Sequence, residues 1–149
     1  MASGLHGYIG AKLTHYLLSH VDEQELGHVF DSSVTYDFND GLPKREPDVS
    51  FILSERMAEP TDEDITVAPD IAAEVVSKND KWFDIRRKIQ QYQQSGVRLV
   101  WILTSVDRTV DVYRLENGLR SESLLVDDVL DGGSVLPEFR VPIRKLFPK

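Results

Sequence analysis

The sequence contains no cysteine. This absence excludes a disulfide framework, a thiolate nucleophile and any zinc or iron–sulfur site with cysteine ligands. Long apolar runs are also missing, because no stretch approaches the roughly 18 to 20 residues that span a bilayer, and the N-terminus lacks the basic and apolar regions of a signal peptide. We therefore expect a cytoplasmic location, no membrane partner, and chemistry that uses oxygen, imidazole and amine groups.

Positive charge is scarce in this chain. Lysine and arginine number 17 against 25 aspartate and glutamate residues, which leaves a formal net charge of −8. Affinity for duplex nucleic acid depends mainly on neutralising phosphates, so this balance argues against tight, non-specific binding of DNA. A metal site would offset part of the charge, since a sequence tally counts the carboxylates and leaves out the cations they hold.

Length and hydrophobic pattern together predict one α/β domain. A chain of 149 residues supports one hydrophobic core, so we expect a single domain over residues 1–149. Apolar residues at helical spacing predict helices over 5–21 and from a cap at Asn79 or Asp80 to Ser95. Strands are predicted over 28–38 (a strand or hairpin arm), 47–53, 71–77, 97–103, 109–115 and 123–126. This order predicts a mixed β-sheet flanked by helices on both faces.

Two carboxylates interrupt predicted strands. Asp48 lies at the head of the strand PDVSFIL, and Glu74 lies within the otherwise apolar run IAAEVVS. An unpaired buried carboxylate is costly, and one bound cation would satisfy both groups. The alternative is that Asp48 caps a turn and that Glu74 bonds a backbone group or a basic side chain. The pair is therefore a hypothesis of a metal site.

Lys88 strengthens this hypothesis. It lies on the predicted helix that follows Glu74, at the margin of an apolar stripe that includes Ile85, Ile89 and Tyr92. At about 100° per residue, this position lets the ammonium group reach over the sheet edge. The alternative is an ordinary surface lysine whose stem packs on the helix and whose charge points into water.

Several linked segments resemble one known family. The run APDIAAEVVSKND, followed by KIQQYQQSGV, VWIL and TVDVYR, with EPDVSF upstream, is similar to the pattern of the Uma-two family, a restriction-endonuclease-like branch of the PD-(D/E)XK nuclease superfamily. The resemblance extends from about His6 to the C-terminus. Asp48 falls on the family's Pro-Asp aspartate and Glu74 on the acid of the superfamily signature. Val76 occupies the usual lysine position, and Lys88 matches the place on the next helix to which the family has moved its lysine.

The resemblance implies a metal-dependent endonuclease. Asp48, Glu74 and Lys88 would be the catalytic residues, and Mg²⁺ (or Mn²⁺) would be held by Asp48, Glu74 and the backbone carbonyl of Val75. Such a site hydrolyses phosphodiester bonds of nucleic acid, with DNA the expected substrate. The metal polarises a phosphoryl oxygen and activates water, while Lys88 orients that water or stabilises the developing charge.

A second function remains open, because family members carry an N-terminal extension with a glutamate in a short hairpin. This chain begins almost at the first helix, so we expect the extension to be absent. That expectation and the net charge favour a non-catalytic interaction or structural domain that retains the nuclease fold. Retention of all three site residues favours the nuclease.

Three further expectations concern residues outside this trio. Asp70 is interpreted as a structural residue at a strand entrance, and His6 as a satisfied or exposed histidine rather than a metal ligand. We also expect a homodimer, because the strand 109–115 and the apolar residues Leu146 and Phe147 would leave an exposed edge and patch.

Overall fold

A six-stranded sheet forms the centre of the protein, whose computed structural model describes residues 3–149. Its strands are β1 (Gly27–Phe30), β2 (Val49–Leu53), β3 (Ile71–Val76), β4 (Leu99–Thr104), β5 (Thr109–Arg114) and β6 (Arg120–Leu124), and they lie side by side in chain order. Only β3 and β4 run parallel, because only this pair is joined by a crossover helix, α2 (Trp82–Ser95). The sheet is therefore mixed, as the sequence predicts.

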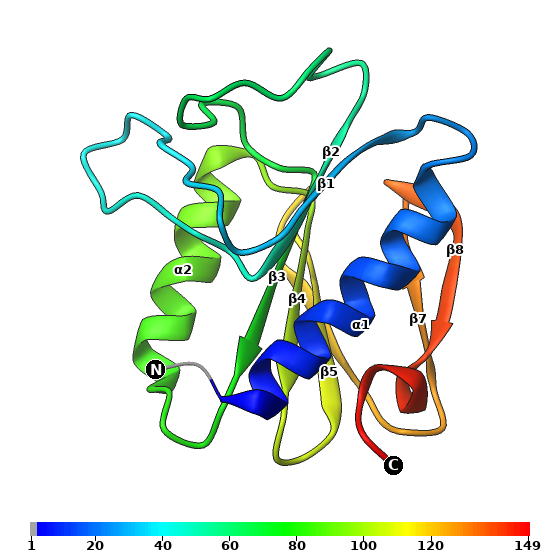
Figure 1. Ribbon diagram of the computed structural model, residues 1–149. Coiled ribbons are helices and arrows are strands. Elements are labelled where there is room, and N and C mark those ends of the chain that lie inside the picture. The colour runs from blue at the N-terminus through cyan, green and yellow to red at the C-terminus, as the bar shows by residue number, and fades with distance from the viewer. Residues whose placement is uncertain (1–2) are drawn as a thin grey trace.

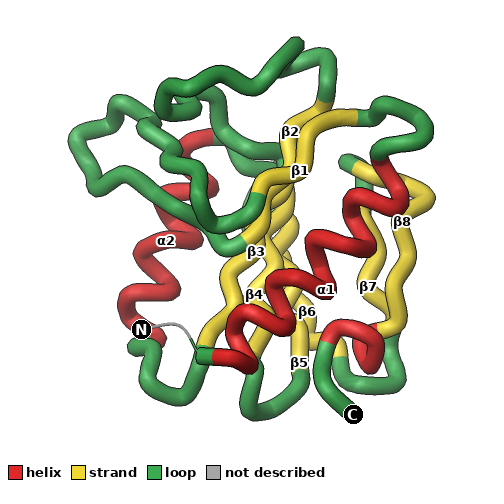
Figure 2. Tube along the Cα trace, viewed as in Figure 1, coloured by secondary structure: helices red, strands yellow, loops and turns green. Residues whose placement is uncertain are grey.

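The two helices cover opposite faces of this sheet (Figures 1 and 2). On one face, α1 (Gly4–Val21) buries Ile9, Leu13, Leu17 and Val21, which recur every four residues and form one stripe. On the other face, α2 buries a stripe that includes Ile89. Successive residues of a strand point to opposite faces, so each face of the sheet has its own core. The predicted helix on each face is confirmed.

Alternation along β3 decides which helix each of its side chains meets. Ala73 and Val75 pack in the core that contains α1, whereas Ala72 and Val76 pack in the core that contains α2. Glu74 lies between these positions in the same alternation, so its side chain points to the α2 side. This orientation brings its carboxylate within reach of side chains on α2.

The C-terminal region contains a second sheet that the sequence analysis missed. Strands β7 (Val129–Gly132) and β8 (Leu136–Pro142) form an antiparallel hairpin, followed by a short 3-10 helix over Ile143–Leu146. The hairpin lies on the same side of the large sheet as α1 (Figure 2), and Phe139 stacks on the buried Trp101 of β4 with ring centroids 5.9 Å apart. This hairpin completes the cover of that face.

Burial in this region removes the two grounds for the expected homodimer. The strand β5 is not an edge, because β6 pairs with its outer side, and Leu146 and Phe147 are 0% and 3% exposed. The edge strand is instead β6, whose residues Arg120 to Ser123 are exposed and polar. Both premises were wrong, because β6 covers the outer side of β5 and because Leu146 and Phe147 pack into the core that contains α1. The homodimer itself stays a prediction.

The start of α2 also differs from expectation. The residue at the N-cap is Lys81, and no side chain caps the first turn, so neither Asn79 nor Asp80 is the cap. Asp80 instead accepts a hydrogen bond from the Ser77 amide at 2.7 Å and so closes the turn that precedes the helix. The helix ends at Ser95, as predicted, and Gly96 follows it in the left-handed conformation (φ 95°). Within residues 3–149, neither helix is long and apolar enough to cross a membrane.

Candidate active site

Asp48 lies one residue before β2, directly beside the middle of β3. Val49 pairs with Ala73 in the antiparallel ladder, so continuing the register places Asp48 opposite Glu74. The Oδ2 atom of Asp48 accepts a hydrogen bond from the Val75 amide at 2.7 Å. Its Oδ1 atom lies 3.1 Å from Nε2 of His6. Both carboxylate oxygens are therefore held by protein groups from two different elements.

Glu74 is a buried carboxylate in a strand whose six residues are all buried. Only 5% of the residue is exposed. Its Oε1 atom lies 3.2 Å from Nζ of Lys88, and its Oε2 atom accepts a hydrogen bond from the Tyr92 hydroxyl at 2.6 Å. Burial raises the pKa of Glu74, the Lys88 charge and the Tyr92 hydrogen bond lower it, and the Asp48 charge raises it again, with a net rise. The two acids are thus electrostatically coupled.

Lys88 and Tyr92 reach Glu74 from the same face of α2. Residues four apart in a helix lie one above the other, so one stripe presents both the ammonium group and the hydroxyl group. The Tyr92 side chain is fully buried, whereas 35% of the Lys88 side chain is exposed. Burial and the neighbouring Glu74 carboxylate raise the pKa of Tyr92 well above its usual value. Tyr92 therefore stays a hydrogen-bond donor to Glu74 at all ordinary pH values.

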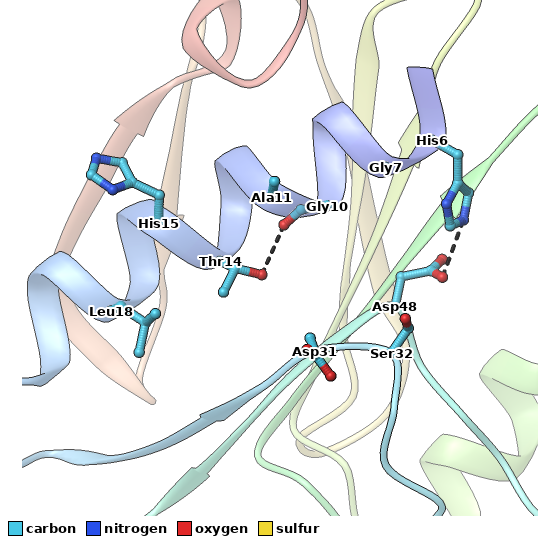
Figure 3. Close-up of a pocket in the computed structure, with 10 residues that line it drawn as sticks. All are labelled: His6, Gly7, Gly10, Ala11, Thr14, His15, Leu18, Asp31, Ser32 and Asp48. Carbon is cyan, nitrogen blue, oxygen red and sulfur yellow. Dashed lines mark hydrogen bonds and ion pairs between the residues drawn. The ribbon is translucent and has the colours of Figure 1, made fainter. Parts of the chain in front are cut away.

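A cleft of about 690 Å³, which we call the site cleft, opens onto these groups. Asp48, Glu74, Val75 and Lys88 all line it, together with His6 on the first turns of α1. A second groove of about 520 Å³ runs along α1 and shares His6 and Asp48 with the site cleft. Figure 3 shows His6 at the start of the helix pointing toward Asp48, with the groove continuing past it. Asp48 is therefore accessible from two directions.

Comparison with known proteins assigns the chain to a family. A sequence model for the family described as "Uma2: Putative restriction endonuclease" matches residues 1–144. The chain belongs to the Uma2 family. Its fold is similar to that in a crystal structure described as "a putative nuclease belonging to DUF820" from Anabaena variabilis, with a TM-score of 0.83 and 23% identity, over 99% of this chain and 82% of that chain. Among curated proteins, none matches. The resemblance to the Uma-two family and the predicted fold class are confirmed.

In this Uma2 chain, the structure brings the predicted site residues together to different degrees. Lys88 contacts Glu74, and Asp48 lies just before the neighbouring strand β2, where it contacts the Val75 amide. The Val75 carbonyl as a metal ligand stays a prediction. Among residues 3–149, no group of three or more His, Cys, Asp or Glu side chains is arranged to hold a metal ion. Any metal at this site would therefore rely on two carboxylates, backbone oxygen and water.

Two contacts of the Uma2 site were not predicted from the sequence. Tyr92 was assigned to the core stripe of α2, although its spacing of four residues from Lys88 already placed both on one face. His6 was interpreted as satisfied or exposed, and its partner proves to be Asp48. No local pattern links these two residues, which lie 42 positions apart in the chain.

Asp70 forms a separate buried ion-pair cluster at the entrance of β3. Only 1% of the residue is exposed. Its carboxylate accepts a hydrogen bond from the Leu53 amide at 2.9 Å and lies 2.9 Å from Arg56 and 3.8 Å from Arg98. These partners join β2, β3 and β4, and Asp70 is not among the residues that line the site cleft. The geometry agrees with its interpretation as a structural residue.

Proposed function

We propose that this Uma2 chain is a metal-dependent endonuclease that hydrolyses phosphodiester bonds of DNA at the Asp48, Glu74 and Lys88 site. One observation supports this proposal above all: a buried carboxylate in a central strand faces a cleft, with a second carboxylate beside it and a lysine in contact with it. Such coupled, desolvated titratable groups in a concave site are typical of catalytic centres.

The donor chemistry fits a hard divalent cation. Mg²⁺ prefers oxygen ligands, keeps several waters and is commonly bound by one or two carboxylates, so two acids and a backbone carbonyl suffice. Asp48 and Glu74 would hold the ion together with the Val75 carbonyl, and Mn²⁺ would serve in its place. When bound, the metal supplies charge stabilisation at the phosphoryl oxygen and a water of lowered pKa.

The remaining residues position these groups. His6 and the Val75 amide fix the two oxygens of Asp48, so the orientation of its carboxylate does not depend on solvent. Tyr92 fixes one oxygen of Glu74 from the buried side. The partly exposed ammonium group of Lys88 faces the site cleft, where it would orient the attacking water and stabilise negative charge as the phosphodiester bond breaks.

The experiment that tests this function is a cleavage assay with a matched variant. The parent protein and Glu74→Gln are incubated with single-stranded and duplex DNA and with RNA, in Mg²⁺, in Mn²⁺ and in EDTA. Glutamine keeps the size of the side chain and can still accept the hydrogen bond from Tyr92. We expect cleavage by the parent only with metal and none by Glu74→Gln. Metal-independent cleavage, or equal cleavage by both proteins, would overturn the proposal.

A second candidate is a non-catalytic domain that retains the nuclease fold. The observation in its favour is that both oxygens of Asp48 and both oxygens of Glu74 already have partners within the protein. Such a cluster is satisfied without an ion, as the structural alternative for these acids requires. Absence of cleavage on every substrate, in a folded parent protein with either metal, would favour this candidate. The homodimer and the cytoplasmic location stay predictions under both.

A further inference from the structure

Away from the site, a cleft of about 530 Å³ concentrates positive charge. We call it the basic cleft and define it by Lys12, Arg108, Arg144 and Lys145 together with Tyr8 and Tyr16, which line it. Among the described residues, no aspartate or glutamate lines this cleft. In a chain with a net charge of −8, such segregation of positive charge marks a surface suited to an anionic ligand.

Most of these cations are free to meet a ligand. Within residues 3–149, Lys12, Arg108 and Lys145 make no ion pair, whereas Arg144 pairs with Asp127 at 2.6 Å. Arg108 and Lys145 are exposed, and Lys12 is half-buried. When unpaired lysine and arginine side chains neutralise phosphates, they release the cations condensed on the nucleic acid, and this release is the main source of affinity.

Aromatic rings lie beside these charges. Tyr8, Lys12 and Tyr16 follow one another at steps of four residues, so they share one face of α1 and span about 12 Å along its axis. The Tyr8 side chain is 41% exposed, and the Lys12 ammonium lies 5.4 Å from the centre of its ring. A groove that alternates cations with accessible aromatic rings is typical of surfaces that bind single-stranded nucleic acid, because bases stack on the rings.

The charges of the site cleft cannot themselves attract a nucleic-acid strand. Its lining contains five carboxylates but only three lysines, so it carries a negative balance without bound cations: the acids are Glu46, Asp48, Glu74, Asp80 and Asp84, and the lysines are Lys78, Lys81 and Lys88. A phosphodiester strand that enters the site cleft therefore needs a positively charged surface elsewhere to hold it.

The basic cleft and the site cleft share no lining residue, but two elements contribute nearby residues to both. On α1, Leu5 and His6 line the site cleft, and Tyr8 lines the basic cleft less than one helical turn later. In the turn between β4 and β5, Val106 lines the site cleft and Arg108 lines the basic cleft. Figure 1 shows that this turn, the first turns of α1 and the C-terminal segment lie at one end of the molecule. The basic cleft and part of the site cleft therefore lie at the same end of the molecule.

We propose that the basic cleft binds a single nucleic-acid strand where it leaves the site cleft. Lys12, Arg108 and Lys145 contact its phosphates, and Tyr8 stacks on a base. This inference rests on the proposed function, because nucleic acid is favoured over other polyanions by the position of the basic cleft at the same end of the molecule as the site cleft. It adds a binding surface that contains none of the residues assigned to metal binding or catalysis.

The test measures binding in EDTA, so that cleavage plays no part. Fluorescence anisotropy of a labelled single-stranded oligonucleotide is recorded over a series of salt concentrations for the parent, for Lys12→Gln/Arg108→Gln and for Arg120→Gln/Arg140→Gln. Both double variants remove two positive charges, but Arg120 and Arg140 lie on β6 and β8 and do not line the basic cleft. Loss of two phosphate contacts should lower the slope of log K against log salt by about 1.4, and the control should leave the slope unchanged.

Stacking is tested separately with Tyr8→Ser. Loss of one base–aromatic stack should weaken binding of the single strand about fivefold or more, without changing the salt slope. Equal slopes for the parent and Lys12→Gln/Arg108→Gln, equal losses in the two double variants, or no binding by the parent would each overturn the inference. Binding to vesicles rich in anionic lipid, without binding to the oligonucleotide, would also overturn it and assign the cleft to membranes.

These results are independent of the cleavage assay. A basic cleft that binds DNA in a protein that never cleaves would retain this inference and remove the proposed catalysis. Cleavage by a parent whose binding does not depend on Lys12 and Arg108 would retain the proposed catalysis and remove this inference.

Discussion

The Nζ atom of Lys88 lies 3.2 Å from the Oε1 atom of Glu74, although the two residues belong to different elements 14 positions apart in the chain. In the superfamily signature, the lysine follows the acid on the same strand, where this chain has Val76. In this chain, α2 packs on the face of the sheet to which Glu74 points, and it places the Lys88 ammonium group beside the Glu74 carboxylate. The lysine that contacts the acid therefore comes from the following helix instead of from the same strand.

Divalent metal should stabilise the folded protein. A ligand that binds only the native state at ten times its dissociation constant adds about 1.4 kcal/mol, which for a chain of this size raises the melting temperature by about 3 to 6 °C. The shift with Mg²⁺ or Mn²⁺ should vanish in Glu74→Gln and persist in Asp84→Asn, which removes an exposed carboxylate from the rim of the same cleft. Differential scanning calorimetry measures all three, and an unchanged shift in Glu74→Gln would exclude Glu74 as a ligand.

Lys88→Ala should separate metal binding from catalysis. If Lys88 acts on water and on the transition-state charge, cation titration should still show binding, while metal-dependent cleavage falls by roughly 10² to 10³. The unfolding free energy should fall by about 1 to 2 kcal/mol, less than for a fully buried pair, because Lys88 is 35% exposed and Tyr92 still bonds Glu74.

The control for Lys88→Ala is Arg120→Ala, which removes an exposed cation on the edge strand β6. It should leave both cation binding and cleavage unchanged. Equal cleavage rates in the parent and Lys88→Ala would exclude Lys88 from catalysis.

Asp70→Asn should lower the stability of the fold and leave the cleavage rate unchanged. The substitution removes the charge that two arginines share and weakens a cluster that joins three strands, so the unfolding free energy should fall by about 2 to 3 kcal/mol. This is less than a fully buried pair would lose, because the arginine side chains are 35% and 29% exposed. Urea unfolding measures the loss, and the cleavage rate of the folded fraction should match the parent. A selective loss of cleavage would assign Asp70 a catalytic role.

Alkaline pH should destabilise the protein partly through Tyr36. Its buried hydroxyl lies 2.7 Å from the Ser50 hydroxyl, and burial raises its pKa far above the ordinary value of 10.0. The stability that this phenol contributes is fully present below pH 10 and is lost as pH rises further, because the unfolded chain then releases a proton that the folded chain keeps. One such group changes the unfolding free energy by at most about 1.4 kcal/mol per pH unit.

Tyr36→Phe should therefore flatten the fall in stability above pH 10, although it weakens the protein at neutral pH by about 1 to 2 kcal/mol by leaving Ser50 without its partner. Urea unfolding at several pH values gives the slope for each protein. Tyr8→Phe is the control, because the Tyr8 side chain is exposed. An unchanged slope in Tyr36→Phe would contradict the assignment.

How far the sequence predicted this molecule depends on the range of the interactions involved. Both helices and the central strands were predicted, because their burial repeats with the period of each element. The contact between Lys88 and Glu74 was accessible for the same reason, since one helical stripe and one strand alternation decide it. The hairpin β7–β8 was not, because its short strands carry a register irregularity at Asp131/Gly132 and its burial depends on packing against distant β4.

The partner of His6 shows the same limit within the site. Its contact with Asp48 requires α1 to cross the sheet so that its first turns end beside the start of β2, and no local pattern encodes that crossing. Tyr92 is the opposite case, because its position one turn after Lys88 was available from the sequence. Which residues share a face of one helix or strand can be predicted from their spacing in the sequence. Which residues of different elements come into contact depends on how the whole core packs.

The order of the large sheet has a consequence for how the site assembles during folding. Each strand lies beside its immediate predecessor in the chain, although the partners in the first three pairings are still 20 to 28 residues apart. Asp48, Glu74 and Lys88 all come from the consecutive unit β2, β3 and α2 with its flanking residues. The acids and the lysine can therefore meet as soon as that single unit forms, before β6 and the C-terminal hairpin are in place.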